Sequence, residues 1–296
     1  MTSSYSNKQK AFTLAEILVV IAVLGLLATL IFTITRGAGE QGRIAKGLYF
    51  SQHLHNSLGS YAAGIWQFDE GSGTAASDIS GWGSNGTLVN APTWRCASSD
   101  SSYTPSGQGC SLEFNGSTQY VNVLDNASLN IAGTITIEAW VKLNSITQVS
   151  QSIVAKNTSS NTGYWLFYNR SDNQKFGFYG VDNKLASSTI TPNVEEWTHV
   201  VVIREGTDVT FYINGIFDIT NNVGGIVNPV SYNPLRVGVR SDSVTWPFNG
   251  FIDEVRVYEA SLTSAQIQSQ YYAGLDRLLT KGLMDEGEYK QRLVRN

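Results

Sequence analysis

The pattern of hydrophobic and polar positions changes three times along the chain, and the first change ends a long apolar run. From Phe12 to Phe32 the only charged residue is Glu16. A helix of this length rises about 30 Å, which is enough to cross the hydrocarbon core of a bilayer. The run therefore predicts a transmembrane helix over residues 12–32, preceded by a polar segment of ten residues and Ala11.

Beyond the apolar run, hydrophobic residues recur at near-helical spacing as far as residue 62. This spacing predicts that the helix continues outside the membrane. Glycines at 37, 39, 42 and 47 weaken it by up to about 1 kcal/mol each. We expect either a locally melted zone, which would suit an extensible filament, or a poor helix that serves as a stalk.

From Gly64 onward the pattern alternates with period two. Thr134–Leu143 places five apolar side chains on one face and polar residues and Trp140 on the other, which is typical of a half-buried strand. Asn214-Gly215 indicates a hairpin, because both central residues of a type I′ turn need positive φ. Short strands without intervening helices predict a β-sandwich or jelly roll. Further strands are expected at Tyr164–Tyr168, Lys175–Tyr179, Trp197–Arg204, Val209–Ile213, Leu235–Arg240 and Gly250–Tyr258.

The C-terminal end returns to helical spacing. A helix is predicted over Ser261–Tyr272, where Thr263 and Gln266 form a capping box. After Gly274 a short helical hairpin is expected, which either packs on the sandwich or contacts a neighbouring molecule.

Charge and cysteine content narrow the classes of partner and compartment. The formal net charge is −4, only 15% of residues are charged, and the basic residues are scattered, which argues against nucleic acid as a partner. Cys96 and Cys110 have no CxxC pair or histidine cluster near them, which argues against a zinc site. In an exported domain they predict a disulfide, and the alternative is two unpaired thiols.

The apolar run is preceded and begun by a specific set of residues: Lys10, Ala11, Phe12, Thr13, Leu14 and Glu16. With these residues the N-terminal segment resembles that of type IV pilins and type II secretion pseudopilins. The resemblance implies that a prepilin peptidase cuts between Ala11 and Phe12 and methylates the new amine of Phe12. It also implies that Glu16 pairs with the Phe12 amine of a neighbouring subunit; otherwise Glu16 is the snorkelling carboxylate of a plain membrane anchor. Ala11 stands where the family usually has glycine.

Seven short motifs follow one another along the β region: WQFDEGSG (66–73), DISGWGSNGTL (78–88), LEFNGSTQYVNV (112–123), ITIEAWV (135–141), EWTHVV (196–201), FYING (211–215) and FNGFIDEVRVY (248–258). With these motifs the β region resembles the LamG-like, concanavalin A-like jelly-roll family over residues 64–272. Relatives often hold a structural calcium, and the positions that match are Asp78, Asn85 and Asp253. The alternative is capping of a turn by Asp78 and Asn85 and a surface salt bridge for Asp253.

The sequence gives little support for catalysis. No Glu-x-Asp-x-x-Glu pattern occurs, and the neighbouring acids of Glu195–Glu196 and Asp253–Glu254 are expected to point to opposite faces of a strand. His199 is expected to be a structural histidine. Sugar-binding faces use exposed aromatic rings, so Trp82 and Trp246 in predicted loops are the candidate ligand residues, with structural packing as the alternative.

These features predict a mostly β protein: a concanavalin A-like jelly-roll sandwich after a long N-terminal helix, with a short helical tail. The expected segments are a leader (1–11), a transmembrane and filament-forming helix (12–62), the jelly roll (63–273) and the tail (274–296). The expected function is a pilin-like surface filament subunit that assembles with copies of itself or other pilins and recognises carbohydrates or cell surfaces. It would start as a single-pass precursor in the bacterial inner membrane. A secretion pseudopilin and a tethered glycan-active enzyme are the alternatives.

Overall fold

A computed structural model describes residues 59–96, 104–105, 109–148, 150–158, 162–169, 174–182 and 184–294. The chain divides into two compact units, 1–49 and 50–296, and all described residues belong to the second. The predicted leader, the membrane helix, the cleavage site at Ala11–Phe12 and Glu16 lie outside the described residues. Within the described part of the chain, none of the helices combines the length and apolarity needed to cross a membrane.

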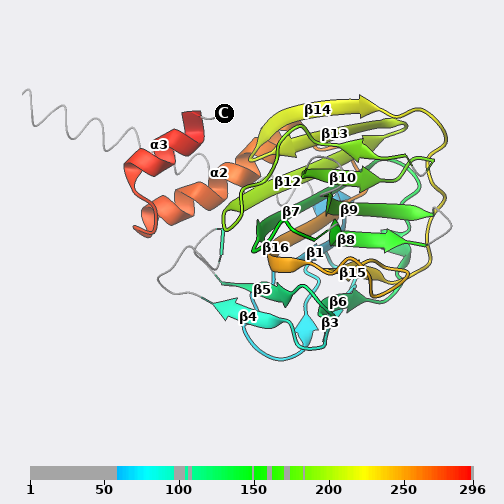
Figure 1. Cartoon of the computed structure of the whole chain (residues 1–296), viewed down its shortest axis with the longest axis horizontal. Coiled ribbons are helices and arrows are strands. Elements are labelled where there is room, and N and C mark those ends of the chain that lie inside the picture. Colours follow the sequence, from blue (N-terminus) through cyan, green and yellow to red (C-terminus); the bar gives the residue numbers. More distant parts are fainter. Residues whose placement is uncertain are drawn as a thin grey trace, which may run out of the picture. The chain divides into compact units, whose positions relative to one another are not determined.

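Two antiparallel sheets of eight strands each pack face to face (Figure 1). Sheet A has the order β14 (Ile216–Asn222), β13 (Asp208–Ile213), β12 (Trp197–Glu205), β7 (Ile135–Leu143), β16 (Asn249–Tyr258), β5 (Cys110–Asn115), β4 (Thr93–Cys96), and β1 (Ala62–Trp66) also pairs with β16. Sheet B has the order β11 (Ala186–Ser187), β10 (Lys175–Tyr179), β9 (Gly163–Asn169), β8 (Ser150–Asn157), β15 (Leu235–Val237), β6 (Tyr120–Val123), β3 (Gly86–Val89), β2 (Ala75–Ala76). The same unit contains two short 3₁₀ helices, Gly59–Tyr61 and Ala127–Leu129.

The core lies between the two sheets and follows the period-two pattern of the sequence. Ile137 and Val141 of β7 belong to the same buried cluster as Leu166 of β9 and Val237 of β15. Alternating side chains from the inner faces of both sheets thus fill one continuous core, as expected for a sandwich. The mostly β sandwich predicted from the sequence is confirmed.

The hairpin predicted at Asn214-Gly215 is present. Both residues have positive φ, 53° and 80°, and they join β13 to β14. Gly215 is packed against the ring of Tyr271, because a Cβ built there would lie 3.0 Å from ring atoms of that side chain. The turn therefore needs glycine both for its backbone conformation and for this close approach.

Strand β7 differs from the half-buried strand that its sequence predicts, since both of its faces are buried. Glu138 is 0% exposed and Lys142 is 6% exposed, although both point away from the sandwich core. The reason is a second layer: Tyr271 and Leu275 of helix α2 (Ser264–Thr280) pack with Trp140 on the outer face of sheet A.

The C-terminal helices cover this outer face of sheet A. Thr263 caps α2 as predicted, with its Oγ1 accepting a hydrogen bond from the Gln266 backbone N–H at 3.3 Å. The helix runs through Gly274, so the expected domain boundary after residue 273 lies inside α2. Helix α3 (Glu286–Val294) follows, and Tyr289 joins the cluster around Trp140. Of the two roles expected for the tail, the structure shows packing on the sandwich.

Candidate functional site

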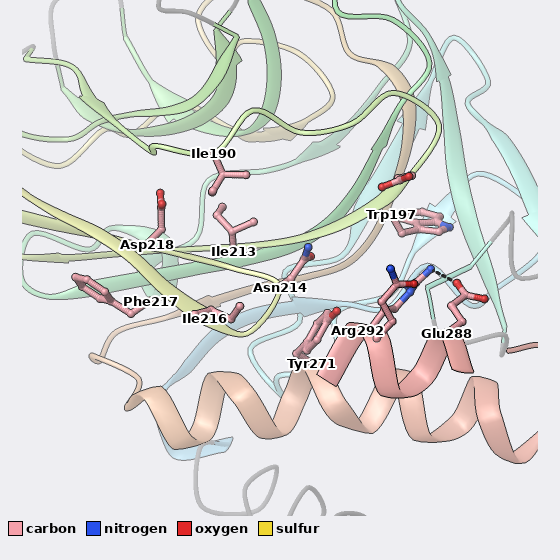
Figure 2. Close-up of a pocket in the computed structure, with 12 residues that line it drawn as sticks. Ile190, Trp197, Ile213, Asn214, Ile216, Phe217, Asp218, Tyr271, Glu288 and Arg292 are labelled. Atoms are coloured by element: carbon pink, nitrogen blue, oxygen red, sulfur yellow. Dashed lines mark hydrogen bonds and ion pairs between the residues drawn. The ribbon is translucent and has the colours of Figure 1, made fainter. Parts of the chain in front are cut away.

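A groove with a volume of about 810 Å³ lies where the end of sheet A meets the C-terminal helices (Figure 2). The β13–β14 hairpin and the start of β12 form one side, and α2 and α3 form the other. The loop before β12 contributes Ile190 and Glu196. The remaining lining residues are Trp197, Ile213, Asn214, Ile216, Phe217, Asp218, Tyr271, Glu288, Gln291 and Arg292.

The walls of the groove are aromatic and aliphatic. Phe217 is 55% exposed, and its ring packs edge-to-face against Tyr212 with centroids 5.9 Å apart. Tyr271 is nearly buried and stacks on Trp140 at 5.5 Å, which fixes its position on α2. The groove thus combines an accessible aromatic ring with rigid apolar walls, a composition that suits small organic ligands.

Fixed polar groups surround these walls. Asp218 accepts hydrogen bonds from the backbone N–H, at 2.7 Å, and the hydroxyl of Thr189. Glu288 accepts one from Arg292 of the same helix at 2.7 Å. Asn214 Oδ1 accepts one from the backbone N–H of His199 at 2.9 Å. Because these partners hold the side chains in place, the groove offers preorganised acceptors beside an aromatic surface.

Trp246, one of the two tryptophans predicted to bind a ligand, lies on the outer face of sheet B rather than in the groove. Its ring stacks on Trp165 of β9 with centroids 4.6 Å apart and an interplanar angle of 9°. The guanidinium of Arg240 lies 4.9 Å from the Trp246 ring centroid. Phe167 and Tyr179 extend the same cluster. Trp246 therefore packs within an aromatic stack, and its ring contacts other side chains of the protein.

Trp82, the other predicted tryptophan, is 57% exposed. Its indole N–H donates a hydrogen bond to the carbonyl of Ala62 at 2.8 Å, so the ring is both exposed and held in place. The structure thus puts Trp82 and Trp246 in two different environments, and neither lines the groove.

Each of the three residues predicted to hold calcium accepts hydrogen bonds from neighbouring protein groups. Asp78 accepts hydrogen bonds from the backbone N–H groups of Ile65, Ser80 and Ser84 and from the Ser80 hydroxyl. Asn85 Oδ1 accepts one from the Asp78 backbone N–H at 2.8 Å. This is the capped turn that the sequence left open as the alternative.

Asp253 lies in β16 instead, where its Oδ1 accepts a hydrogen bond from the Glu254 backbone N–H at 2.8 Å. Among the described residues, no group of three or more His, Cys, Asp and Glu side chains is arranged to hold a metal ion. Calcium binding stays a prediction. Addition of EDTA tests it, because removal of a structural calcium would lower the melting temperature.

Asp253 and Glu254 do not point to opposite faces, as strand alternation would require. Both Ile252 and Val255 belong to the sandwich core, and the register of β16 against β7 shifts between Asp253 and Arg256. Glu254 has a φ of 51°, so the extra residue forms a β-bulge. Both acids therefore lie on the outer side of sheet A.

A buried network of charged groups occupies this outer side beneath α2. Glu138 accepts a hydrogen bond from Arg256 at 2.8 Å and contacts His199 Nε2 at 2.9 Å. Burial alone raises the pKa of Glu138, but Arg256 and His199 outweigh it and hold the pKa below its usual range. Burial raises the pKa of Asp253, and the Glu254 and Asp69 carboxyls raise it further. These acids are buried, which suits a structural network.

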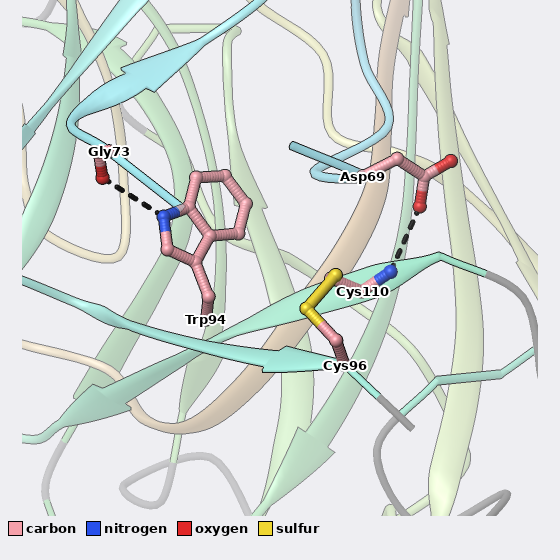
Figure 3. The surroundings of a disulfide bond; sticks show 5 residues. All are labelled: Asp69, Gly73, Trp94, Cys96 and Cys110. Atoms are coloured by element: carbon pink, nitrogen blue, oxygen red, sulfur yellow. Dashed lines mark hydrogen bonds between the residues drawn. A yellow bond between two sulfur atoms is a disulfide. The ribbon is translucent and has the colours of Figure 1, made fainter. Parts of the chain in front are cut away.

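The two cysteines form a disulfide between the last residue of β4 and the first residue of β5 (Figure 3). Asp69 Oδ1 accepts a hydrogen bond from the Cys110 backbone N–H at 3.0 Å. Trp94 Nε1 donates to the carbonyl of Gly73 at 3.0 Å. The bond therefore joins two neighbouring strands, and the loop after β1 is hydrogen-bonded to both of them.

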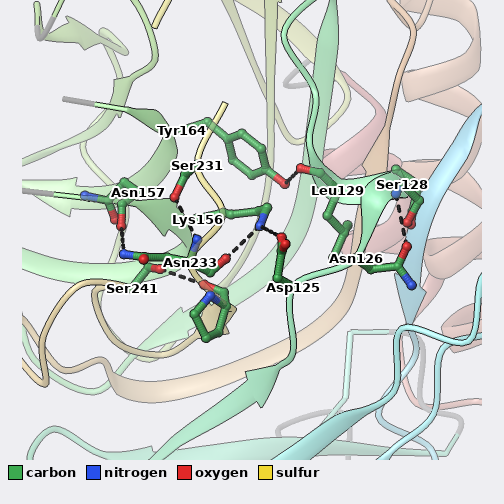
Figure 4. Close-up of polar contacts among 12 residues, drawn as sticks. Asp125, Asn126, Ser128, Leu129, Lys156, Asn157, Tyr164, Ser231, Asn233 and Ser241 are labelled. Carbon is green, nitrogen blue, oxygen red and sulfur yellow. Dashed lines mark hydrogen bonds and ion pairs between the residues drawn. The ribbon is translucent and has the colours of Figure 1, made fainter. Parts of the chain in front are cut away.

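Sequence reasoning missed a buried lysine near the end of β8, a central strand of sheet B (Figure 4). Lys156 is 0% exposed, and its ammonium donates hydrogen bonds to Asp125 Oδ1 and to the carbonyl of Asn233, both at 2.6 Å. Burial lowers the pKa of Lys156, and Asp125 opposes that shift. These two hydrogen bonds connect the loops that carry Asp125 and Asn233 to β8.

The groove was also missed, because its walls come from segments that are far apart in the chain. Phe217 and Trp197 carry no local signal beyond the strand pattern. The helical spacing of residues 275–294 predicted helices that could pack on the sandwich, but it did not indicate which face of the sandwich they would cover.

Two sequence signatures match the chain. The concanavalin A-like lectin/glucanases superfamily matches residues 115–268, just over half of the chain. The prokaryotic N-terminal methylation motif matches residues 6–32. No curated protein matches the chain significantly in sequence.

Several solved structures share the fold. Domain 4 of AbnA, a GH43 extracellular arabinanase from Geobacillus stearothermophilus in complex with arabinotriose, has a TM-score of 0.54 and 19% identity, over 70% of this chain and 97% of that one. The binding domain of Paraclostridial Mosquitocidal Protein 1 has a TM-score of 0.57 and 15% identity, over 74% and 53%. Trypanosoma rangeli sialidase has a TM-score of 0.52 and 13% identity, over 77% and 38%. The chain thus spans about half or less of the latter two, and identities this low show the fold alone.

Proposed function

Because the chain belongs to the concanavalin A-like lectin/glucanases superfamily, we propose that it is a type IV pilin-like surface filament subunit whose jelly-roll domain binds carbohydrate. The observation that carries this proposal is the order of the two signatures in one chain, with the methylation motif at 6–32 ahead of the lectin-like domain at 115–268. The motif implies a membrane-anchored precursor that is later exported, and the domain is of a carbohydrate-binding type.

In this proposal the N-terminal segment works as in pilins. Residues 12–32 insert in the bacterial inner membrane, a prepilin peptidase cuts after Ala11, and Phe12 becomes the methylated N-terminus. Glu16 then pairs with the Phe12 amine of a neighbouring subunit, either a copy of this chain or another pilin. A buried carboxylate and a buried amine neutralise each other, and their positions set the axial stagger between helices.

The groove supports the carbohydrate-binding part of the proposal. A sugar presents an apolar ring face together with hydroxyl groups, so its site needs an aromatic surface beside fixed polar groups. Phe217 supplies an accessible ring, and Asn214 and Asp218 supply oriented polar atoms. The solved complex of the arabinanase domain with arabinotriose supports the same class of ligand. Trp82 and the Trp246 stack remain candidates for additional glycan contacts.

We assign the domain a binding role rather than a catalytic one. Glycosidases need two acids that reach the same bond, within roughly 5–10 Å of each other. The strand acids Glu138 and Asp253 are 0% and 1% exposed, so neither carboxyl is accessible to a substrate in this structure.

Two measurements on the full chain test the two halves of the proposal. Immunogold labelling of sheared surface filaments is expected to decorate the fibres; protein that stays in the cell envelope would favour a secretion pseudopilin instead. The full chain, purified in detergent, is expected to bind at least one oligosaccharide on a glycan array, and Phe217→Ala is expected to weaken that binding about tenfold. Unchanged binding by this variant would remove the groove from the proposal. Turnover of any bound glycan would favour the enzyme alternative.

A further inference from the structure

We infer that the groove between the β13–β14 hairpin and α3 selects glycans that carry amino groups and discriminates against glycans that carry carboxylates. This inference rests on the proposed carbohydrate-binding function and adds the chemical class of the ligand. The groove is concave, its walls are preorganised, and the charges along it are unequal in sign.

Three carboxyl side chains line the groove, Glu196, Asp218 and Glu288, against a single cationic side chain, Arg292. The lining residues thus carry a formal charge of −2. Like charges brought together at partly shielded sites repel each other, and opposite charges attract. A sugar carboxylate entering the groove would add a fourth negative group, whereas a sugar ammonium would find three acceptors.

The one cation in the groove is already engaged. Arg292 Nη2 lies 2.7 Å from Glu288 Oε1, one helical turn away on α3. Recognition of a carboxylate by arginine relies on the planar guanidinium fork, which an existing carboxylate partner competes for. An acidic sugar would therefore have to displace Glu288 before Arg292 could bind it.

Asp218 is held in a defined position without being neutralised. Both of its hydrogen-bond partners, the backbone N–H and hydroxyl of Thr189, are uncharged. An ionised carboxylate has about four acceptor sites, so two donors leave capacity for a ligand. An ammonium group at this position would form a charge-assisted hydrogen bond, which is stronger than a neutral one.

Helix α3 offers a matched pair of variants. Glu286 pairs with Lys290 at 2.9 Å, and Glu288 pairs with Arg292 at 2.7 Å, with the same spacing along the helix. Only the second pair lines the groove. Glu288→Gln and Glu286→Gln therefore remove the same charge from the same helix, inside and outside the site. For a partly exposed pair, each removed carboxylate changes ligand affinity on the order of two- to fivefold.

The test uses the full chain in detergent on one array of neutral, aminated and uronic-acid oligosaccharides. Aminated glycans are expected to bind at least about tenfold more tightly than acidic ones, as the effects of the carboxylates combine. Glu288→Gln and Asp218→Asn are each expected to reduce this ratio by about two- to fivefold, and Glu286→Gln is expected to leave it unchanged.

The possible failures are distinguishable. Acidic glycans that bind as tightly as aminated ones would overturn the inference while leaving carbohydrate binding intact. An equal loss of preference in Glu286→Gln and Glu288→Gln would also overturn it, because the preference would then come from the overall charge of the helix. Absence of binding to every class would refute the proposed function, and the inference with it.

Discussion

The indole ring of Trp140 on β7 stacks on the phenol ring of Tyr271 on α2, with centroids 5.5 Å apart and an interplanar angle of 18°. This contact joins the outer face of sheet A to the C-terminal helices. Tyr271 also lines the groove and packs against Gly215 at the tip of the hairpin opposite. One aromatic pair therefore couples the docking of α2 to the shape of the groove.

Replacing Tyr271 with alanine is expected to destabilise the domain and to open the groove. A buried aromatic side chain truncated to alanine costs about 3–5 kcal/mol, because contacts are lost and a cavity remains. Tyr271 is 3% exposed, so this range applies. Thermal unfolding of the full chain in detergent, followed by tryptophan fluorescence, measures the effect.

The matched control is Tyr271→Phe, which keeps the ring and its stacking. Its expected cost is below about 1.5 kcal/mol, the range for one hydrogen-bonding group. Equal losses in the two variants would show that stacking on Trp140 does not hold α2 in place.

Stability is expected to respond to pH through Asp253. Burial and the carboxyls of Glu254 and Asp69 raise the pKa of Asp253 well above its unfolded value, which is about 3.9. A raised carboxyl pKa means that the folded state binds the proton more tightly than the unfolded state. This contribution to stability is complete below the unfolded pKa, and it is lost as pH rises toward the folded pKa.

Asp253→Asn removes the cost of ionising a buried carboxyl group. The amide keeps Oδ1 as acceptor for the Glu254 backbone N–H and carries no charge. The variant is expected to be more stable than the native chain at pH 7 by about 1–3 kcal/mol, and the difference is expected to vanish near pH 3. Melting curves across this range measure it, with exposed Glu259→Gln as control. A variant that is less stable at pH 7 would contradict the assigned shift.

The Cys96–Cys110 disulfide is expected to contribute about 3 kcal/mol to stability, the entropic value for a closed loop of this size. A reducing agent should therefore lower the melting temperature of the native chain. The double variant Cys96→Ser/Cys110→Ser should melt at that lower temperature with or without reductant. A native chain insensitive to reductant would contradict the prediction.

Much of the fold could be predicted from local patterns. The Asn214-Gly215 turn and the capping box at Thr263 are local in sequence, and the structure contains both. Strand alternation identified the core face of β7 correctly, because Ile137 and Val141 do face the core. These features depend on a few neighbouring residues, so periodicity and turn chemistry are sufficient to find them.

The outer face of sheet A could not be predicted in this way. Glu138 is a charged residue type, which on a strand normally indicates a solvent-facing position, yet it is 0% exposed on the face against which α2 packs. The bulge at Asp253–Glu254 interrupts the alternation of side chains along β16. Neither bulge residue is a glycine, so the sequence carries no local signal for it. The groove combines a hairpin near residue 215 with a helix near residue 290, and this pairing is decided by tertiary packing alone.

At the other end of the chain, Glu16→Ala is expected to reduce filament assembly by at least about tenfold while leaving membrane insertion intact. The apolar run is unchanged by this substitution, but the proposed pairing with the Phe12 amine would be lost. The comparison of sheared and membrane fractions by immunoblot measures it, with Thr13→Ala as a control in the same segment. Normal filament yield from Glu16→Ala would contradict the stagger mechanism.

The most direct test of the account is mass spectrometry of the N-terminus of the protein recovered from sheared surface filaments. A processed filament subunit would yield a chain that begins at Phe12 and carries one methyl group on its amine. A filament protein that still begins at Met1, or a sheared fraction that lacks the chain altogether, would contradict the central claim that this lectin-like domain is displayed on a processed filament subunit.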